Sequence, residues 1–266
     1  MIVLKNRDNS AAITQYDRFP DNTLLMKLMV GNENEIVWKY ENDSELFAVY
    51  CIARHIKQKG LNVGLVMDYI PNARQDRVKE PRDVFTLKYF AELINSCDFD
   101  YVEVLDPHSP VSEALINNIR VDNGGEYIEK VLKELGEDVI VYYPDNGAHK
   151  KYTSFITQPA CYGVKKRDWA TGKILGLDIM LNGIDIKNKT ILMVDDIIAY
   201  GGSMFYGAKA LKELGCGDIY IYATHVENSI LEGELIDSGL FKKIFTTGSL
   251  FNKEHKLIEV LTKTEV

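Results

Sequence analysis

The sequence has few cysteines, and their spacing suggests neither a cross-link nor a metal site. Disulfide frameworks and zinc sites use closely spaced or repeated cysteine pairs, whereas this chain of 266 residues has no CxxC pair. We therefore expect a protein of the reducing cytoplasm. The cysteines are Cys51, Cys97, Cys161 and Cys216.

Long apolar runs are also missing. The first ten residues, MIVLKNRDNS, contain no apolar core of a signal peptide, and no stretch approaches the roughly 18 apolar residues that a membrane span requires. The expectation is a soluble chain that does not enter a membrane.

Positive charge is in short supply, since the formal net charge is -8. Nucleic acids and anionic membranes are bound by basic surfaces, so neither is an expected partner. Any phosphate group must be bound by a local arrangement of donors.

The chain does have enough apolar sequence for a large core or two modest ones, because 46% of it is hydrophobic and 26% is charged. From about residue 60, short β-branched runs alternate with helical segments, which is typical of α/β domains with a mostly parallel sheet flanked by helices. We expect two such domains, 1–140 and 141–266, although nothing in the composition marks that boundary. The expected strands are 63–70, 101–105, 139–143, 191–194 and 219–223, and the expected helices are 84–97, 204–214 and one that begins near residue 43 or 44, with Leu46, Tyr50 and Ile56 facing inward.

The most informative segment is residues 190–203, TILMVDDIIAYGGS, in which an apolar strand leads into two carboxylates, two glycines and a hydroxyl. Gly201 and Gly202 allow the backbone to approach an anion, and the amides at the start of the following helix favour negative charge. Ser203 adds a hydroxyl donor. Asp195 and Asp196 repel phosphate but can accept hydrogen bonds from vicinal sugar hydroxyls, so the pattern predicts a ribose phosphate site. A capped turn without a ligand is the alternative interpretation.

A second polar segment, Asn72-Ala-Arg-Gln-Asp-Arg77, follows another apolar strand. Ligands of open α/β sheets bind at the carboxyl ends of strands, and the fork of Arg74 can grip phosphate oxygens while Gln75 or Asp76 meets ring nitrogens or amines. Alternatively, Arg74 and Arg77 pair with the nearby surface acids Glu80 and Asp83.

Three further segments have ordinary interpretations when each is taken alone. His108, in Leu105-Asp-Pro-His-Ser-Pro110, would be a core or capping residue, because Mg²⁺ prefers oxygen ligands. Asp145, in YPDNG, would be a turn residue. Lys165-Lys-Arg167, which leads into an expected polar loop with Trp169, Gly172 and Lys173, would be solvated surface.

Together these segments resemble the ribose-phosphate diphosphokinase family, a branch of the type I phosphoribosyltransferase-like fold. The two acids with Gly-Gly-Ser resemble the ribose-phosphate signature of that fold, and ARQDR, DPHSP and the strand end YATH at 222–225 resemble motifs of the diphosphokinases. Arg18-Phe-Pro-Asp-Asn-Thr23 resembles half of the family's RFSDGE segment. The similarity runs from about residue 18 to residue 225 in the family's order.

The resemblance implies a cytoplasmic, Mg²⁺-dependent transferase that moves diphosphate from ATP to the anomeric hydroxyl of a ribose phosphate and works as a homo-oligomer, a dimer or larger. It also implies a role for each matched position. Lys165 and Arg167 would be catalytic; Phe19, Asp21, Arg74, Gln75, Asp76 and His108 would bind ATP, with Phe19 and Asp21 reaching a neighbouring subunit; His108 and Asp145 would hold Mg²⁺; and Asp195, Asp196, Ala199, Tyr200, Gly201, Gly202 and Ser203 would bind the ribose phosphate.

The chain departs from the family at Ala199-Tyr200, where Asp-Thr is usual, and at Asn22-Thr23, where Gly-Glu is usual. Tyr200 either donates its hydroxyl to the 5-phosphate or makes room for a longer 5-substituent such as that of ADP-ribose. Two other functions stay open: a phosphoribosyltransferase that uses a nucleobase, and an inactive homologue that regulates an active one.

Overall fold

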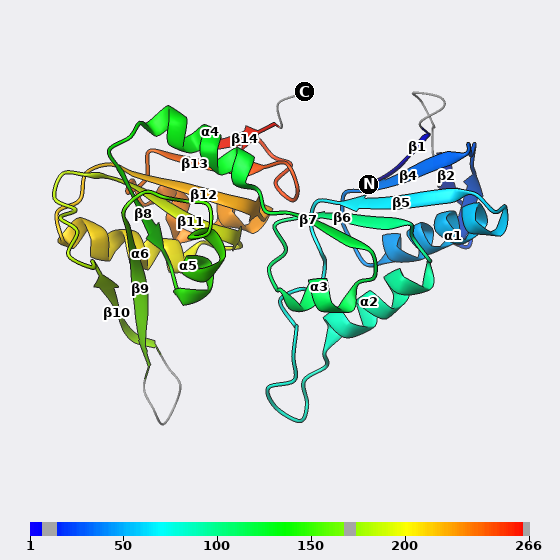
Figure 1. Cartoon of the computed structure of the whole chain (residues 1–266), viewed down its shortest axis with the longest axis horizontal. Coiled ribbons are helices and arrows are strands. Elements are labelled where there is room, and N and C mark those ends of the chain that lie inside the picture. Colours follow the sequence, from blue (N-terminus) through cyan, green and yellow to red (C-terminus); the bar gives the residue numbers. More distant parts are fainter. Residues whose placement is uncertain (7–14, 168–173, 263–266) are drawn as a thin grey trace. The chain divides into compact units, whose positions relative to one another are not determined.

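The computed structural model describes residues 1–6, 15–167 and 174–262. It separates into two compact units, Met1–Asn123 and Gly124–Val266, each with its own sheet (Figure 1). Both are α/β units with a mostly parallel sheet, as the sequence predicts. None of the helices in the described ranges combines the length and hydropathy needed to cross a lipid bilayer.

The first unit is built on a five-stranded sheet of order β1-β4-β5-β6-β7, in which only β1 is antiparallel to its neighbour. A separate antiparallel pair, β2 and β3, precedes β4 in the chain. The strands are β1 Ile2–Asn6, β2 Gln15–Arg18, β3 Leu24–Lys27, β4 Glu33–Trp38, β5 Asn62–Met67, β6 Tyr101–Leu105 and β7 Ile119–Asp122, and the helices are α1 Ser44–Gln58, α2 Thr86–Ser96 and α3 Val111–Leu115.

Helix α1 covers this sheet with a stripe of apolar residues at helical spacing. Val49, Ile52 and Ile56 are fully buried against the core. Tyr50 was expected to face inward but is 37% exposed, because it lies one position past Val49 and so about 100° around the helix from the stripe. The side chain of Asp43, the residue before the helix, makes no bond to the helix amides; its carboxylate accepts from the Tyr40 hydroxyl at 2.9 Å.

The second unit is built on a seven-stranded sheet of order β10-β9-β8-β11-β12-β13-β14, parallel except for the β9–β10 ribbon. Buried side chains of β8, β11 and β12 form the centre of its core. The strands are β8 Val139–Tyr143, β9 Ala160–Arg167, β10 Ile174–Met180, β11 Thr190–Ile198, β12 Ile219–Val226, β13 Lys243–Thr247 and β14 Ile258–Leu261; the helices are α4 Gly125–Leu135, α5 Asn146–Tyr152, α6 Gly202–Glu213, the short 3₁₀ turn η1 Asn228–Glu232 and α7 Glu234–Asp237.

The division between the units falls at Asn123/Gly124, earlier than the boundary expected near residue 140. Helix α4, which the sequence assigned to the first domain, belongs to the second. Its Glu134 pairs with Lys243 of β13 at 3.3 Å, and its Lys130 donates to the carbonyl of Thr262 at 2.6 Å. Since nothing in the composition marks this point, contacts made far along the chain decide the division.

Gly64 allows the ring of Tyr101 to cross over strand β5. Gly64 of β5 lies between Glu35 of β4 and Tyr101 of β6, and the Tyr101 hydroxyl donates to Glu35 at 2.7 Å. The ring therefore passes over Gly64, where a Cβ atom would lie 2.1 Å from it. Arg120 packs on the same ring, with its guanidinium carbon 4.5 Å from the ring centroid, and hinders its displacement.

We expect Gly64→Ala to lower the free energy of unfolding by about 1–3 kcal/mol, the usual cost of overpacking. In a Tyr101→Val background, Gly64→Ala should lower the free energy of unfolding far less than it does in the wild-type background, because the ring with which its Cβ clashes is absent. Denaturant unfolding of the two single variants and the double variant measures this coupling. Equal effects of the alanine in both backgrounds would contradict the role given to the ring.

Candidate functional site

In the second unit, parallel pairing brings the predicted sugar-binding acids to the carboxyl edge of the sheet. Strand β11 pairs with β8 over Thr190–Met193 and with β12 as far as Ile198. The sequence placed Asp195 and Asp196 at the end of the strand, but they lie within it. They occupy the part of β11 that extends beyond its pairing with β8. Asp145 follows β8 at the same edge.

The two acids have different surroundings. Asp196 is 6% exposed, and its Oδ2 lies 3.1 Å from the ammonium of Lys151. The carboxylate of Asp195 accepts a hydrogen bond from the amide of Asp196 at 2.9 Å. Desolvation, followed by the adjacent charge of Asp196, raises the pKa of Asp195 well above its ordinary value.

Lys151 is a site residue that the sequence did not reveal. It lies near the end of α5, next to Lys150, and the two lysines are equivalent in a sequence pattern. Only the side of the helix that faces β11 in the structure shows which of the two lysines reaches the acid pair. A lysine one helical turn or two after a strand-end acid is the signal that could have suggested it.

Asp145 begins α5 and is held by the helix that it caps. Its Oδ1 accepts from the amides of Gly147 at 2.9 Å and Ala148 at 3.2 Å. The turn role expected of Asp145 is therefore present, and its role as a metal ligand stays a prediction. Among the described residues, no three His, Cys, Asp or Glu side chains gather as a metal cluster. Magnesium that accompanies a nucleotide takes one or two carboxylates and completes its shell with phosphate and water, so a single fixed carboxylate fits that mode.

The predicted phosphate loop begins helix α6. Gly201 has a left-handed φ of 81° and caps the helix, and a Cβ atom there would lie 2.6 Å from Leu235. Gly202 faces open space, and Ser203 is exposed. Tyr200 is 59% exposed, while its carbonyl packs against Gly233. Ala199, also predicted to bind the sugar phosphate, is half-buried.

In the first unit, the ARQDR and DPHSP segments are tied together beyond the carboxyl ends of β5 and β6. The Ser109 hydroxyl donates to Asp76 at 2.7 Å, and Arg77 donates to both oxygens of Asp76 at 2.6 and 2.8 Å. These bonds, that of Arg77 first, lower the pKa of Asp76 to about 2. Arg77 thus pairs with Asp76, not with Glu80 or Asp83.

The residues of these two segments differ in exposure and in the contacts that they make. The Gln75 side chain accepts from the Thr86 hydroxyl at 3.0 Å, so Gln75 and Asp76 hold the loop in shape, and their expected contacts with ATP stay predictions. Arg74 and His108 are both exposed on neighbouring segments. Their predicted contacts with the phosphates of ATP stay predictions.

The RFPDNT segment forms the turn between β2 and β3. Phe19 is 48% exposed, which suits a stacking surface. Asn22 has a φ of 68°, so it occupies the left-handed conformation for which the family's glycine is suited, and asparagine tolerates it. The carboxylate of Asp21 accepts from the Thr23 hydroxyl at 2.7 Å, which lowers its pKa.

The proposed catalytic cations lie at the end of β9. Lys165 pairs with Leu177 of β10 and Arg167 with Ile174, so both belong to an antiparallel ribbon rather than to a loop after the strand. The loop expected around Trp169, Gly172 and Lys173 lies outside the described residues.

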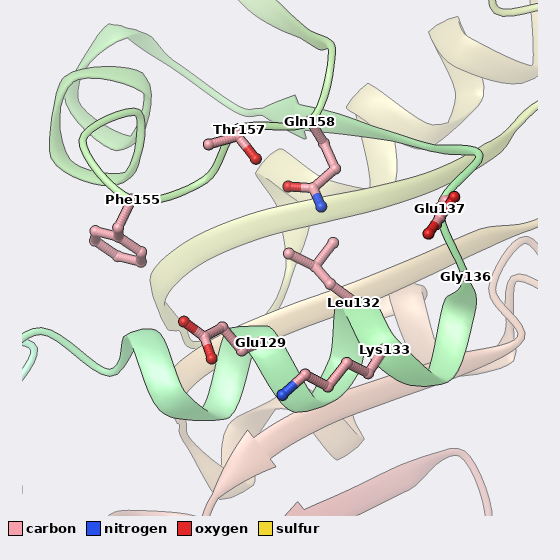
Figure 2. Close-up of a pocket in the computed structure, with 8 residues that line it drawn as sticks. All are labelled: Glu129, Leu132, Lys133, Gly136, Glu137, Phe155, Thr157 and Gln158. Carbon is pink, nitrogen blue, oxygen red and sulfur yellow. The ribbon is translucent and has the colours of Figure 1, made fainter.

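A cavity of about 440 Å³ occupies the other end of the second unit's sheet (Figure 2). Figure 2 shows Leu132 of α4 pointing toward Gln158, and the Lys133 side chain running along the helix toward Glu129; Phe155 and Gln158 lie on the segment leading into β9. This cavity is at the amino ends of β8 and β9, whereas the acids and the glycine loop are at the carboxyl edge. It therefore does not belong to the predicted site.

Comparison with known proteins gives the fold and then the family. The chain matches the crystal structure of phosphoribosylpyrophosphate synthetase from Mycobacterium smegmatis with a TM-score of 0.78 and 19% identity, over 96% of this chain and 87% of that one. It therefore has the phosphoribosyltransferase-like fold that the sequence predicts. No model of a known protein family matches the chain.

Two curated relatives are ribose-phosphate pyrophosphokinases. Pyrophosphokinase is another name for diphosphokinase. That of Bacillus subtilis is 30% identical over 228 residues, 82% of this chain and 69% of that protein. That of Caldanaerobacter subterraneus subsp. tengcongensis is 32% identical over 208 residues, 74% of this chain, and the chain spans 63% of its length. The chain belongs to the ribose-phosphate pyrophosphokinase family, which confirms the resemblance seen in the motifs.

Two glycine variants should separate the structural and binding roles of the loop. We expect Gly201→Ala to lower the free energy of unfolding by about 1–3 kcal/mol, because its Cβ combines a left-handed φ with a clash against Leu235. Gly202→Ala should fold normally, because its Cβ enters open space, but it should weaken binding of ribose 5-phosphate by about tenfold or more by blocking close approach of the anion. Thermal melts and titration calorimetry measure the two effects. Unchanged binding by Gly202→Ala would contradict the phosphate loop.

Proposed function

We propose that the chain transfers diphosphate from Mg²⁺-ATP to the anomeric hydroxyl of ribose 5-phosphate and releases AMP. The observation that carries the proposal is the order of groups along the carboxyl edge of the second unit: acids that suit sugar hydroxyls at Asp195 and Asp196, followed by a helix amino terminus that suits phosphate at Gly201–Ser203. Membership of the ribose-phosphate pyrophosphokinase family supports the same chemistry.

In this mechanism the sugar is oriented by two different kinds of group. Asp195 and Asp196 accept hydrogen bonds from the ring hydroxyls, and the amides at the start of α6, with the Ser203 hydroxyl, donate to the 5-phosphate. The oxygen of the anomeric hydroxyl attacks the β-phosphorus of ATP in line, the bond from that phosphorus to the α,β-bridging oxygen breaks, and AMP leaves with that oxygen. The proton of the attacking hydroxyl passes to solvent.

The cationic residues act on the charge that develops during transfer. Phosphoryl transfer depends mostly on positioning and on neutralisation of charge, so no strong general base is assigned. Lys165 and Arg167 stabilise the oxygens around the β-phosphorus. Arg74 and His108 bind the phosphates of ATP. Phe19 stacks on the adenine of the ATP that is bound to a neighbouring subunit. Bound Mg²⁺ would neutralise phosphate charge, with Asp145 and His108 as its proposed ligands.

Tyr200 favours a second acceptor. Tyr200 is 59% exposed and lies beside the phosphate loop, where the family usually has threonine, so it could offer an aromatic face to a longer group at the 5-position. ADP-ribose, whose adenine could stack there, is the acceptor that this arrangement would add.

We expect mass spectrometry of products to show AMP and a diphosphorylated sugar from ATP and ribose 5-phosphate, without any nucleobase. The same assay with ADP-ribose tests the second acceptor, with Tyr200→Thr as its control, since loss of the ring should reduce turnover of ADP-ribose more than that of ribose 5-phosphate. Turnover of ribose 5-phosphate alone would remove the second acceptor. Base-dependent consumption of phosphoribosyl diphosphate would indicate a phosphoribosyltransferase, and no turnover would indicate a regulatory homologue.

We expect Lys165→Ala to lower kcat by about 10²–10³-fold with little change in thermal stability, because it removes a charge that acts mainly in the transition state. Lys166→Ala, an equal change one residue along β9, should retain most of the activity. Steady-state kinetics and melting curves of both variants check this. Near-normal turnover by Lys165→Ala would refute the catalytic role.

A further inference from the structure

Helix α5 connects two acids of the second unit that the sequence treats separately. At its start, the carboxylate of Asp145 accepts from the amides of Gly147 and Ala148. Near its end, Lys151 reaches Asp196 of β11. The helix is only Asn146–Tyr152, so few backbone torsions separate the two contacts, and a shift of the helix would move both.

The Lys151–Asp196 pair is shielded from solvent and held by its neighbours. Their side chains are 27% and 8% exposed, and Nζ lies 3.1 Å from Oδ2. Tyr152, the next residue along, is fully buried and stacks on Tyr143 of β8, with ring centroids 6.5 Å apart and an interplanar angle of 5°. This packing fixes the end of the helix on the sheet and so fixes the base of the lysine side chain.

The location of this ammonium bears on how an acid pair can bind a phosphorylated sugar. Two adjacent carboxylates repel each other and repel an incoming phosphate, and in a shielded site such repulsion is stronger than it is in water. A charge-assisted hydrogen bond to one carboxylate oxygen offsets one of these charges and leaves the other oxygen to accept from a sugar hydroxyl. It also holds the carboxylate in one orientation before the sugar arrives.

We propose that Lys151 is a positioning residue of the sugar site, which orients Asp196 toward the ribose hydroxyls and neutralises one charge of the acid pair, so that it sets the affinity for the phosphorylated sugar. This inference rests on the proposed function for the identity of the sugar. Lys151 acts through Asp196 and takes no part in the transfer step, so its loss affects sugar binding more than turnover.

The test compares Lys151→Met with Lys151→Arg and with Lys150→Met. We expect Lys151→Met to raise KM for ribose 5-phosphate by about 10- to 100-fold, the loss of one hydrogen bond to a charged group, while kcat and KM for ATP stay near the wild-type values. Lys151→Arg should recover most of the loss. Lys150→Met, which changes the exposed lysine beside it, should behave like the wild type.

Direct binding separates this inference from the proposed function. Calorimetric titration of each variant with ribose 5-phosphate measures affinity even where the wild type forms no AMP, so failure of the catalytic proposal would leave this test intact. Should Lys151→Met unfold at the assay temperature, Lys151→Gln, which keeps a donor of similar length without the charge, replaces it. Equal affinities in the Lys151 and Lys150 variants, or a fall in melting temperature with unchanged affinity, would overturn the proposal.

Discussion

Parallel strand pairing is the constraint on which the rest of the structure depends. Strands that run in one direction deliver their carboxyl ends to one edge of a sheet, so polar residues that follow separate strands come together without any contact in sequence. In the second unit this places Asp145 after β8 beside the acids of β11. In the first unit it brings the segments after β5 and β6 close enough for Ser109 to bond Asp76.

The groups at both edges are fixed by partners within the protein. Asp76 is held by Ser109 and Arg77, and Asp145 by the amides of the helix that it begins. Preorganised groups lose little orientational freedom when a ligand arrives, which suits a reaction that depends on positioning and charge neutralisation rather than on a strong base. Arg74 and His108 in the first unit and Ser203 in the second are exposed on the segments that carry these fixed groups.

The parts of the fold that depend on short-range pattern follow from the sequence. The strands expected at Tyr101–Leu105 and Val139–Tyr143 match β6 and β8 in both bounds, because short, mostly apolar runs rich in valine and tyrosine between polar turns have few alternatives. The order of the motifs along the chain also indicates the family, because it is the family's order. Tyr50 was misplaced because one residue of error in helical phase moves a side chain off the buried face.

What the sequence could not supply are contacts between distant segments. The assignment of α4 to the second unit depends on its bonds to Lys243 and Thr262, more than 100 residues later. The choice of Lys151 over Lys150 depends on the angle at which a short helix meets β11. The bonds of Gln75 to Thr86 and of Asp76 to Ser109 could not be foreseen for the same reason, and they leave the predicted contacts of both residues with ATP untested.

The central claim, that the carboxyl edge of the second unit holds a phosphorylated ribose, is tested most directly by a crystal structure of the chain soaked with ribose 5-phosphate. The account predicts the sugar hydroxyls against Asp195 and Asp196 and the phosphate on the amides of Gly201–Ser203. Density for the sugar in the cavity of α4 and Phe155, with that edge empty, would contradict it.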